Sequence, residues 1–199
     1  MIFALATPTG KAALAVFRIS GSGCHEVISK ILDKNIAEFN RVFLRKIVHD
    51  GVLVDVSTVV FYKSPKSYTG EDMVEIFCHG GFATLKKLID LFHNLNIREA
   101  EPGEFTKIAV LNGKQTLNEA ESLLDLINST TDAEMNMALG VVAGELSNTV
   151  SVLGDELDDI RVFVESIIDF DDEDGVDVSL EEVIELSLIH ISEPTRPLH

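Results

Sequence analysis

An apolar seam in the second half of the chain is the feature that most constrains how this sequence can fold. Its members recur at alternating steps of four and three residues, which places them on one face of a helix. They are Leu146, Val150, Leu153, Leu157, Ile160, Val164 and Ile167. Residues 117–170 contain no proline, and glycine occurs there only at 140, 144 and 154. We therefore expect this whole stretch to be helical.

A helix with such a seam needs partner helices, because its apolar stripe would otherwise stay in water. The expected partners in this chain are a segment near 118–142 and a short helix after residue 179. These would make only a thin bundle. The sequence therefore predicts an incomplete α-helical bundle domain over residues 118–186, whose remaining helices come from another chain or from sequence outside these 199 residues.

The first half of the chain has the pattern of mixed α and β structure. Strands are expected at 13–19, 42–48, 52–62 and 73–78, and helices at 27–32, 82–95 and 104–111. The dipeptide Asp50-Gly51 separates two strand patterns and predicts a type I′ hairpin turn. We therefore expect an α+β domain over residues 1–117, followed by the helical domain.

The charge of the chain changes sharply near residue 118. Residues 1–118 carry 14 Lys+Arg and 12 Asp+Glu, a net charge of +2, whereas residues 119–199 carry 2 and 21, a net charge of −19. A break of this kind is typical of a domain boundary. Nucleic-acid affinity depends on basic side chains that neutralise phosphates. The total of −17 therefore argues against nucleic-acid binding by the acidic helices, but not by residues 1–118.

Targeting signals and cysteine usage favour a cytoplasmic protein. The N-terminus lacks the basic segment and long apolar run of a signal peptide, and no stretch approaches the roughly 20 apolar residues of a membrane span. Cys24 and Cys78 are far apart and belong to no metal-ligand pattern. We expect both to be buried free thiols rather than a disulfide.

The last thirteen positions, 187–199, break both the helical pattern and the acidic bias. Their sequence is similar to the translated read-through of a sequencing adapter. We therefore expect residues 187–199 to be a non-native tail, with native sequence stopping near Leu186. A short native tail is the alternative.

Motifs of common catalytic and metal sites are absent from the sequence. It contains no GxxxxGK[ST], HExxH or GxSxG pattern, and its six histidines lack metal-ligand spacing. We therefore predict no catalytic residue and no metal ligand among these residues.

Three charged residues stand out as candidates for ligand binding. Arg18 lies inside an apolar strand, where its guanidinium requires an acceptor; a ligand oxygen and a structural ion pair are both open. Glu75 shares a strand face with Met73 and Phe77, and its carboxylate can accept two parallel hydrogen bonds from a ligand; a surface position is the alternative. Lys114 follows an Asn-Gly turn and can either hold a ligand carboxylate or remain solvated.

Together these segments resemble the N-terminal part of the MnmE family of tRNA-modification GTPases, also called TrmE. The resemblance covers about residues 1–186 and rests on ordered motifs at compatible spacing. They are ATPTG at 6–10, FRISG at 17–21, SYTGEDMVEIFCHGG at 67–81, PGEFT at 102–106, LNGK at 111–114, NEAESLLDLI at 118–127 and IIDFDDED at 167–174.

The resemblance implies that residues 1–117 have a fold similar to the tetrahydrofolate-binding domain of aminomethyltransferases. In the family this domain dimerises and binds a reduced folate, formyl- or methylene-tetrahydrofolate. By motif, the family's folate-contacting Arg, Glu and Lys correspond to Arg18, Glu75 and Lys114. Glu75 suits the amino-pyrimidine edge of the pterin, and Arg18 and Lys114 suit carbonyl or glutamate oxygens.

The resemblance also implies the activity and the partners. The family installs an aminomethyl-type or (carboxymethyl)aminomethyl group on carbon 5 of the wobble uridine of certain tRNAs, together with an FAD-dependent MnmG-type partner. The family's Ras-like GTPase domain, which uses GTP, Mg²⁺ and K⁺, is missing from this sequence, so we expect no GTP hydrolysis from it. We expect a homodimer through residues 1–117, tRNA binding through the full complex and no membrane association.

Two other functions stay open at this point. One is a stand-alone folate-dependent aminomethyltransferase, which a similar fold allows. The other is a non-enzymatic interaction module, in which the acidic helices bind a basic partner.

Overall fold

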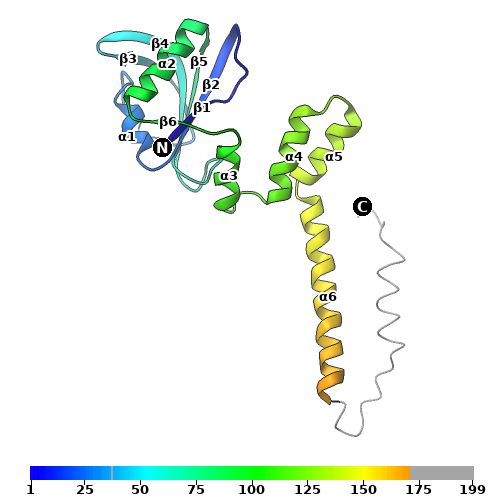
Figure 1. Ribbon diagram of the computed structural model, residues 1–199. Helices are drawn as coiled ribbons and strands as arrows, with labels where there is room; N and C mark the ends of the chain where they lie inside the picture. Colours follow the sequence, from blue (N-terminus) through cyan, green and yellow to red (C-terminus); the bar gives the residue numbers. More distant parts are fainter. Residues whose placement is uncertain (37, 171–199) are drawn as a thin grey trace. The chain divides into compact units, whose positions relative to one another are not determined.

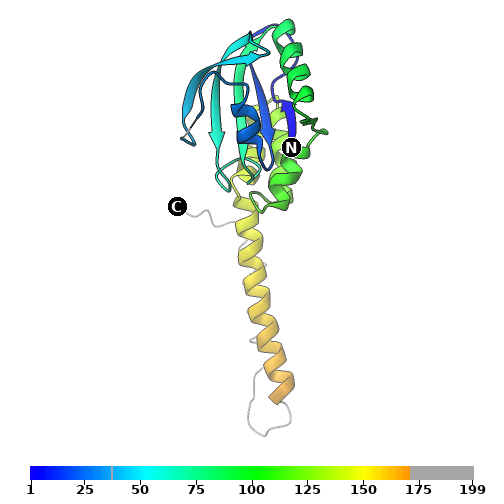
Figure 2. The same cartoon turned by 90° about the vertical axis from the view of Figure 1, so that its left-hand side faces the viewer.

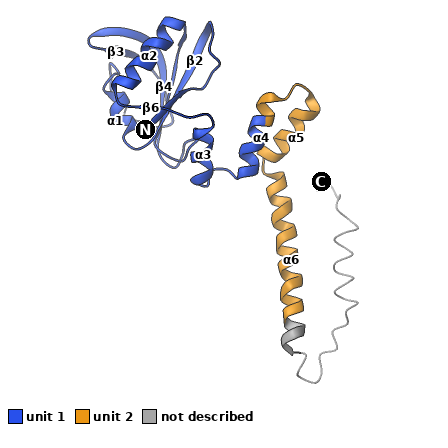
Figure 3. Cartoon of the chain, in the orientation of Figure 1, with its two compact units in different colours: residues 1–124 blue, residues 125–199 orange. Residues whose placement is uncertain are grey.

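The computed structural model describes residues 1–36 and 38–170. The chain divides into two compact units, residues 1–124 and residues 125–199, shown in different colours in Figure 3. The division falls inside the helix α4 (Leu117–Asn128). The helix expected after residue 179 and the tail at 187–199 lie outside the described residues.

The helices and strands carry the labels of Figure 1. In chain order they are β1 (Ile2–Leu5), β2 (Ala12–Ser20), α1 (Cys24–Ser29), β3 (Val42–His49), β4 (Val52–Tyr62), β5 (Met73–Gly80), α2 (Phe82–Asn94), β6 (Arg98–Glu99), α3 (Glu104–Leu111), α4 (Leu117–Asn128), α5 (Asp132–Val142) and α6 (Glu145–Phe170). The described part of the chain is therefore a mixed sheet with six helices, which confirms the predicted α+β unit followed by helices.

The strands of the first unit form one six-stranded sheet in the order β3-β4-β5-β2-β1-β6. Neighbouring strands are antiparallel except β1 and β6, which run parallel. The helices α1 and α2 pack against this sheet (Figures 1 and 2). The strands β2 and β5 lie in the middle of the sheet, so residues paired between them are held by strands on both sides.

The hydrophobic core lies between one face of the sheet and the helices α1 and α2. Phe3, Phe17 and Phe92 meet there, with ring centroids 5.1–6.4 Å apart. On β5 the core side chains alternate, as in Val74 and Ile76, which are fully buried. Burying one large apolar side chain contributes about 1.5–3 kcal/mol. Because successive side chains of a strand point to opposite faces, the intervening residues of β5 face away from this core.

Most of the predicted elements are confirmed. The strand β4 and the helix α3 have the predicted bounds. Asp50 and Gly51 have φ angles of 49° and 75°, as a type I′ turn requires. The strands β1 and β6 were not predicted, because four and two residues give too short a pattern. Their pairing with β2 and with each other defines them.

The first helix is shifted from its predicted position. The spacing of apolar residues predicted a helix over 27–32, whereas α1 spans Cys24–Ser29. Gly23, with a φ of 81°, allows the chain to turn into the helix at Cys24. Leu32 instead forms an isolated bridge with Ile47, so cross-strand pairing replaces the last predicted turn.

The described part of residues 117–170 is helical, as predicted, but it forms three helices. The segment expected near 118–142 is divided into α4 and α5, because Thr131 begins a new helix. The Thr131 hydroxyl accepts from the Glu134 N–H, and the Glu134 carboxylate accepts from the Thr131 N–H, a reciprocal capping box. Gly144, with a φ of 84°, separates α5 from α6.

The apolar seam lies on α6, which contacts α5. Between Leu146 and Val164 its side chains are mostly exposed, for example Leu153 at 49% and Leu157 at 58%. Further partner helices for this seam therefore stay a prediction. No single described helix is long and apolar enough to cross a membrane; α5 and α6 through Glu165, bent by 50°, pass that test of length and composition only as a pair.

Both cysteines are buried free thiols, as predicted. Burial is the main reason that the pKa of Cys24 rises to about 12 and that of Cys78 to about 11, and nearby carboxylates add to the effect. Thiolate, the reactive form, is therefore disfavoured at both positions.

The close approach of β2 and β5 at Gly80 gives a prediction about stability. A Cβ atom at Gly80 would lie 2.7 Å from the carbonyl oxygen of Ala12, which is backbone and cannot rotate away. We expect Gly80→Ala to lower the free energy of unfolding by about 1–3 kcal/mol, measured by urea denaturation. The matched control is Gly10→Ala, where a Cβ meets nothing within 4 Å. Equal stability of the two variants would contradict the crowding at Gly80.

Candidate functional site

Arg18 and Glu75 lie opposite each other on the central strands β2 and β5. Their neighbours on these strands, including Ile19 and Val74, point into the core. Strand alternation therefore places both charged side chains on the opposite face of the sheet. Two strands distant in sequence thus bring together two residues that the sequence could only identify separately.

The Glu75 carboxylate is held by two neighbouring side chains. Its Oε1 accepts hydrogen bonds from Arg18 Nε at 2.9 Å and Arg18 Nη2 at 2.7 Å. The Tyr62 hydroxyl donates to Oε2 at 3.0 Å. Glu75 is only 9% exposed, and a buried carboxylate is costly unless it is paired and hydrogen-bonded. Burial, followed by the charge of Glu75, raises the pKa of Tyr62 to about 12.

The pair leaves donors and acceptors available for a ligand. Of the five guanidinium N–H groups of Arg18, the bonds to Glu75 use two. Glu75 has about four acceptor positions, and Arg18 and Tyr62 fill three. A ligand that donates two parallel hydrogen bonds to Glu75 must therefore displace one of its present partners.

An aromatic side chain covers the Arg18 guanidinium. The ring centroid of Tyr68 lies 4.6 Å from the central carbon of this group, and that of Phe105 lies at 6.0 Å. The Tyr68 hydroxyl shares a 2.9 Å hydrogen bond with Thr106. A flat ring over a cation is favourable, and it also offers a surface on which a planar ligand can stack. Tyr68 belongs to the loop 63–72, which joins β4 to β5.

Lys114 reaches the same loop from the segment after α3. Its Nζ donates to the Pro65 carbonyl oxygen at 3.1 Å, and its side chain passes close to Gly70. Beside it, Asn112 Nδ2 donates to the Thr69 carbonyl oxygen at 2.7 Å. The loop 63–72 therefore connects Lys114 to the Arg18–Glu75 pair.

The structure brings the three predicted residues to one region, Arg18 and Glu75 in direct contact and Lys114 through the loop. For Arg18 the structure shows an ion pair with Glu75, which is one of the two alternatives that the sequence left open. The surface alternative for Glu75 does not hold, because its side chain is buried and bonded. Lys114 is exposed, yet its ammonium is tied to backbone.

Sequence reasoning missed two residues that shape this site, Tyr62 and Tyr68. Tyr62 ends a strand, and only the register of β4 against β5 brings its hydroxyl to Glu75. Tyr68 lies in the motif SYTGEDMVEIFCHGG at 67–81, which supports the family resemblance without indicating a role for this tyrosine. Its ring reaches Arg18 because of the loop's conformation, which no local pattern in the sequence reveals.

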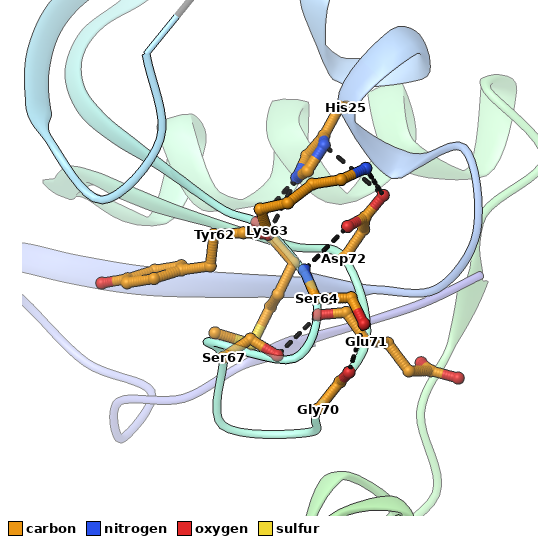
Figure 4. A network of polar contacts seen from close by, with 9 residues as sticks. His25, Tyr62, Lys63, Ser64, Ser67, Gly70, Glu71 and Asp72 are labelled. Carbon is orange, nitrogen blue, oxygen red and sulfur yellow. Dashed lines mark hydrogen bonds and ion pairs between the residues drawn. The ribbon is translucent and has the colours of Figure 1, made fainter.

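The two ends of the loop 63–72 are tied together by Asp72 (Figure 4). Its Oδ1 accepts from the Ser64 N–H at 2.9 Å, and its Oδ2 accepts from Lys63 Nζ at 3.1 Å. Partial burial alone raises the pKa of the Asp72 carboxyl, but the Ser64 N–H and the Lys63 ammonium outweigh it, so the pKa lies below its ordinary value. A hollow of about 510 Å³ lies beside this end of the loop, lined by Ser22, Lys63, Ser64, Gly70, Glu71, Asp72 and Asn112.

A carboxylate–imidazole contact between Asp55 and His79 lies at the far end of β5. Asp55 bonds both the backbone N–H of His79 at 3.0 Å and its Nδ1 at 2.7 Å, and it accepts from the Ser57 hydroxyl at 2.8 Å. Burial raises the pKa of Asp55, but these donors together lower it below its ordinary value. His79 is thereby held at the start of the turn into α2.

Comparisons with known proteins match both parts of the chain to described families. Residues 1–114 match the family described as GTP-binding protein TrmE N-terminus, and residues 117–198 match the family described as MnmE helical domain. The chain is 44% identical over 188 residues to the tRNA modification GTPase MnmE of Thermotoga maritima, which covers 92% of this chain and 40% of that protein. It is 38% identical over 192 residues to MnmE of Aquifex aeolicus, which covers 93% and 42%.

The fold and these matches define a two-domain protein, an α+β unit of the TrmE N-terminal type followed by a helical domain. The chain belongs to the MnmE (TrmE) family of tRNA modification GTPases, as the sequence motifs predicted. It spans about 40% of the length of the curated relatives it matches.

The environment of Tyr62 gives a prediction about pH. Its pKa of about 12 exceeds the value of about 10 in an unfolded chain. Above pH 10 the unfolded state therefore loses a proton that the folded state keeps, so stability falls as the pH rises toward 12. We expect a late phase of tyrosinate absorbance in a pH titration of the folded chain. Tyr62→Phe should remove this phase and Tyr68→Phe should keep it; the reverse would contradict the contact with Glu75.

Proposed function

We propose that this chain is the folate-binding portion of a protein that modifies tRNA. The observation that carries the proposal is that Arg18, Glu75 and Lys114 meet around one loop in a member of the MnmE family. These are the three residues that correspond by motif to the folate contacts of the family. The ligand proposed is a reduced folate, formyl- or methylene-tetrahydrofolate.

The donors and acceptors of the site suit the parts of such a ligand. The Glu75 carboxylate can accept from the amino-pyrimidine edge of a pterin once Tyr62 or Arg18 gives way. The free N–H groups of Arg18 can then reach a pterin carbonyl. The ring of Tyr68 offers a stacking surface, and Lys114 supplies a positive charge for a glutamate carboxylate.

The activity proposed for the whole protein is modification of carbon 5 of the tRNA wobble uridine by an aminomethyl-type or (carboxymethyl)aminomethyl group. It would act with an FAD-dependent MnmG-type partner in the cytoplasm and as a homodimer through residues 1–117. GTP, Mg²⁺ and K⁺ belong to a GTPase domain that this sequence does not contain. Any contact of this chain with tRNA falls on residues 1–118, whose net charge is +2, because the remainder carries −19.

Calorimetry with 5-formyl-tetrahydrofolate tests the proposed ligand. We expect the chain to bind it, and we expect Arg18→Ala or Glu75→Gln to weaken binding by about 1–3 kcal/mol, since each removes a charge-assisted hydrogen bond. Arg41→Ala is the matched control, because its ion pair with Glu38 is exposed. Absence of heat from the unaltered chain with either reduced folate would reject the proposal.

The exposed lysine allows a test that leaves the core untouched. Lys114→Met should weaken binding of the same folate by roughly 0.5–1 kcal/mol, the size of an exposed charge pair, and the loss should shrink as salt screens the interaction. Lys66→Met, a lysine of the same loop, is the control. An unchanged affinity of the Lys114 variant at low salt would remove this residue from the site.

A further inference from the structure

The loop 63–72 is anchored at its ends, and its middle carries a residue of the candidate site. Its anchor is Asp72, which holds Ser64, Lys63 and, through its backbone oxygen, the N–H of Gly21 at 3.1 Å. Its middle carries Tyr68, which covers Arg18. Fixing the ends of the loop restricts where its middle can lie, and the Tyr68 hydroxyl is held in addition by its hydrogen bond with Thr106.

A buried histidine on α1 faces this anchor (Figure 4). His25 Nε2 lies 3.1 Å from the Tyr62 carbonyl oxygen and 3.3 Å from that of Met73. Its Nδ1 lies 3.7 Å from Oδ2 of Asp72. Tyr62 and Met73 flank the loop on β4 and β5, so this one imidazole contacts both ends of the loop as well as its anchor.

The contacts of His25 distinguish between its protonation states. Both ring nitrogens face acceptors, carbonyl oxygens on one side and a carboxylate on the other. A neutral imidazole has one N–H and one bare nitrogen, so either tautomer leaves a lone pair facing an acceptor. Only the doubly protonated ring can donate on both sides.

The surroundings of the ring agree with a positive charge on it. Phe61 stacks on His25 at a centroid distance of 4.9 Å and an interplanar angle of 11°, and Phe39 lies at 5.2 Å; aromatic faces attract cations. The charged groups of the loop nearest to it are Asp72 and Lys63, and both His25 Nδ1 and Lys63 Nζ approach Oδ2 of Asp72, at 3.7 Å and 3.1 Å. Glu26 follows His25 on α1. Lys63 therefore competes with His25 for the same oxygen.

We infer that His25 and Asp72 are positioning residues for the ligand site: they hold the loop 63–72 in the conformation that places Tyr68 over Arg18, and they hold it more firmly when His25 is protonated. This inference rests on the proposed folate function for its effect on binding. The clamp itself is a property of the chain and can be measured without any ligand.

The first test follows the loop without ligand. Nuclear magnetic resonance of the full chain follows the ring signals of His25 and Tyr68 from about pH 5 to about pH 8, the range in which imidazole side chains change charge. The ring signals of Tyr68, assigned with the Tyr62→Phe variant, should shift together with those of His25. In Asp72→Asn, which keeps an oxygen for the Ser64 N–H but loses the charge, Tyr68 should no longer follow His25. Independent behaviour of Tyr68 and His25 in the unaltered chain would overturn the inference.

The second test measures affinity for 5-formyl-tetrahydrofolate across the same pH range. We expect binding to weaken about fivefold as the pH rises, the lower end of typical couplings between sites, and to lose this dependence in His25→Gln and Asp72→Asn. Lys63→Met should steepen it, because the competing cation is gone, and this exposed position carries little risk for folding. A flat profile in the unaltered chain, or unchanged profiles in all variants, would overturn the inference.

The two tests separate failure of the clamp from failure of the proposed function. If the chain binds no reduced folate at any pH, the proposed function is wrong, and the coupling of Tyr68 to His25 still decides the clamp. If folate binds but neither Tyr68 nor the affinity responds to His25, the clamp alone is wrong. Unfolding midpoints of all variants identify any that are lost through misfolding, in which case Lys63→Met decides.

Discussion

The antiparallel pairing of β2 with β5 is the constraint on which the rest of the first unit depends. It places Arg18 directly opposite Glu75 in the middle of the sheet, where strands on both sides fix the backbone. The same register turns Phe17, Ile19, Val74 and Ile76 into the core beneath α1 and α2. One pairing thus both builds the core and presents a hydrogen-bonded ion pair on the other face.

The loop 63–72 completes the candidate site around this rigid pair. It joins β4 to β5. The ring of its Tyr68 covers Arg18, its Pro65 carbonyl oxygen accepts a hydrogen bond from Lys114, and its Asp72 faces His25 of α1. Loops tolerate such roles because they can be repositioned at modest energetic cost while the scaffold stays fixed. The ion pair supplies charged hydrogen-bonding groups in fixed positions, and the loop supplies the Tyr68 ring that covers them.

The helical unit has a different character. The capping box at Thr131 and the turn at Gly144 fix where its helices begin and end, but from Leu146 to Val164 the seam of α6 is mostly exposed. An amphipathic helix of this length gains most of its stability from packing. The family match to a helical domain, in relatives more than twice as long, is consistent with a bundle that needs additional helices.

Local patterns in the sequence were enough to predict the strands β4 and β5, the turn at Asp50 and Gly51, the helix α3 and the helical nature of residues 117–170. Hydrophobic period and turn chemistry act over a few residues, so they are readable without a structure. The local context of each residue, together with the family resemblance, likewise singled out Arg18, Glu75 and Lys114. The strand β6, the start of α1 and the division between α4 and α5 depended on pairing and capping that compete with local preference.

Only the tertiary structure decided that Arg18 pairs with Glu75, that the Tyr62 hydroxyl donates to the other oxygen of the Glu75 carboxylate, and that His25 faces Asp72. Each of these contacts joins two separate elements whose residues lie 13 to 57 positions apart in the sequence. Hydrophobic periodicity does not indicate which distant residues come into contact, because strand register and the packing of separate elements determine those contacts.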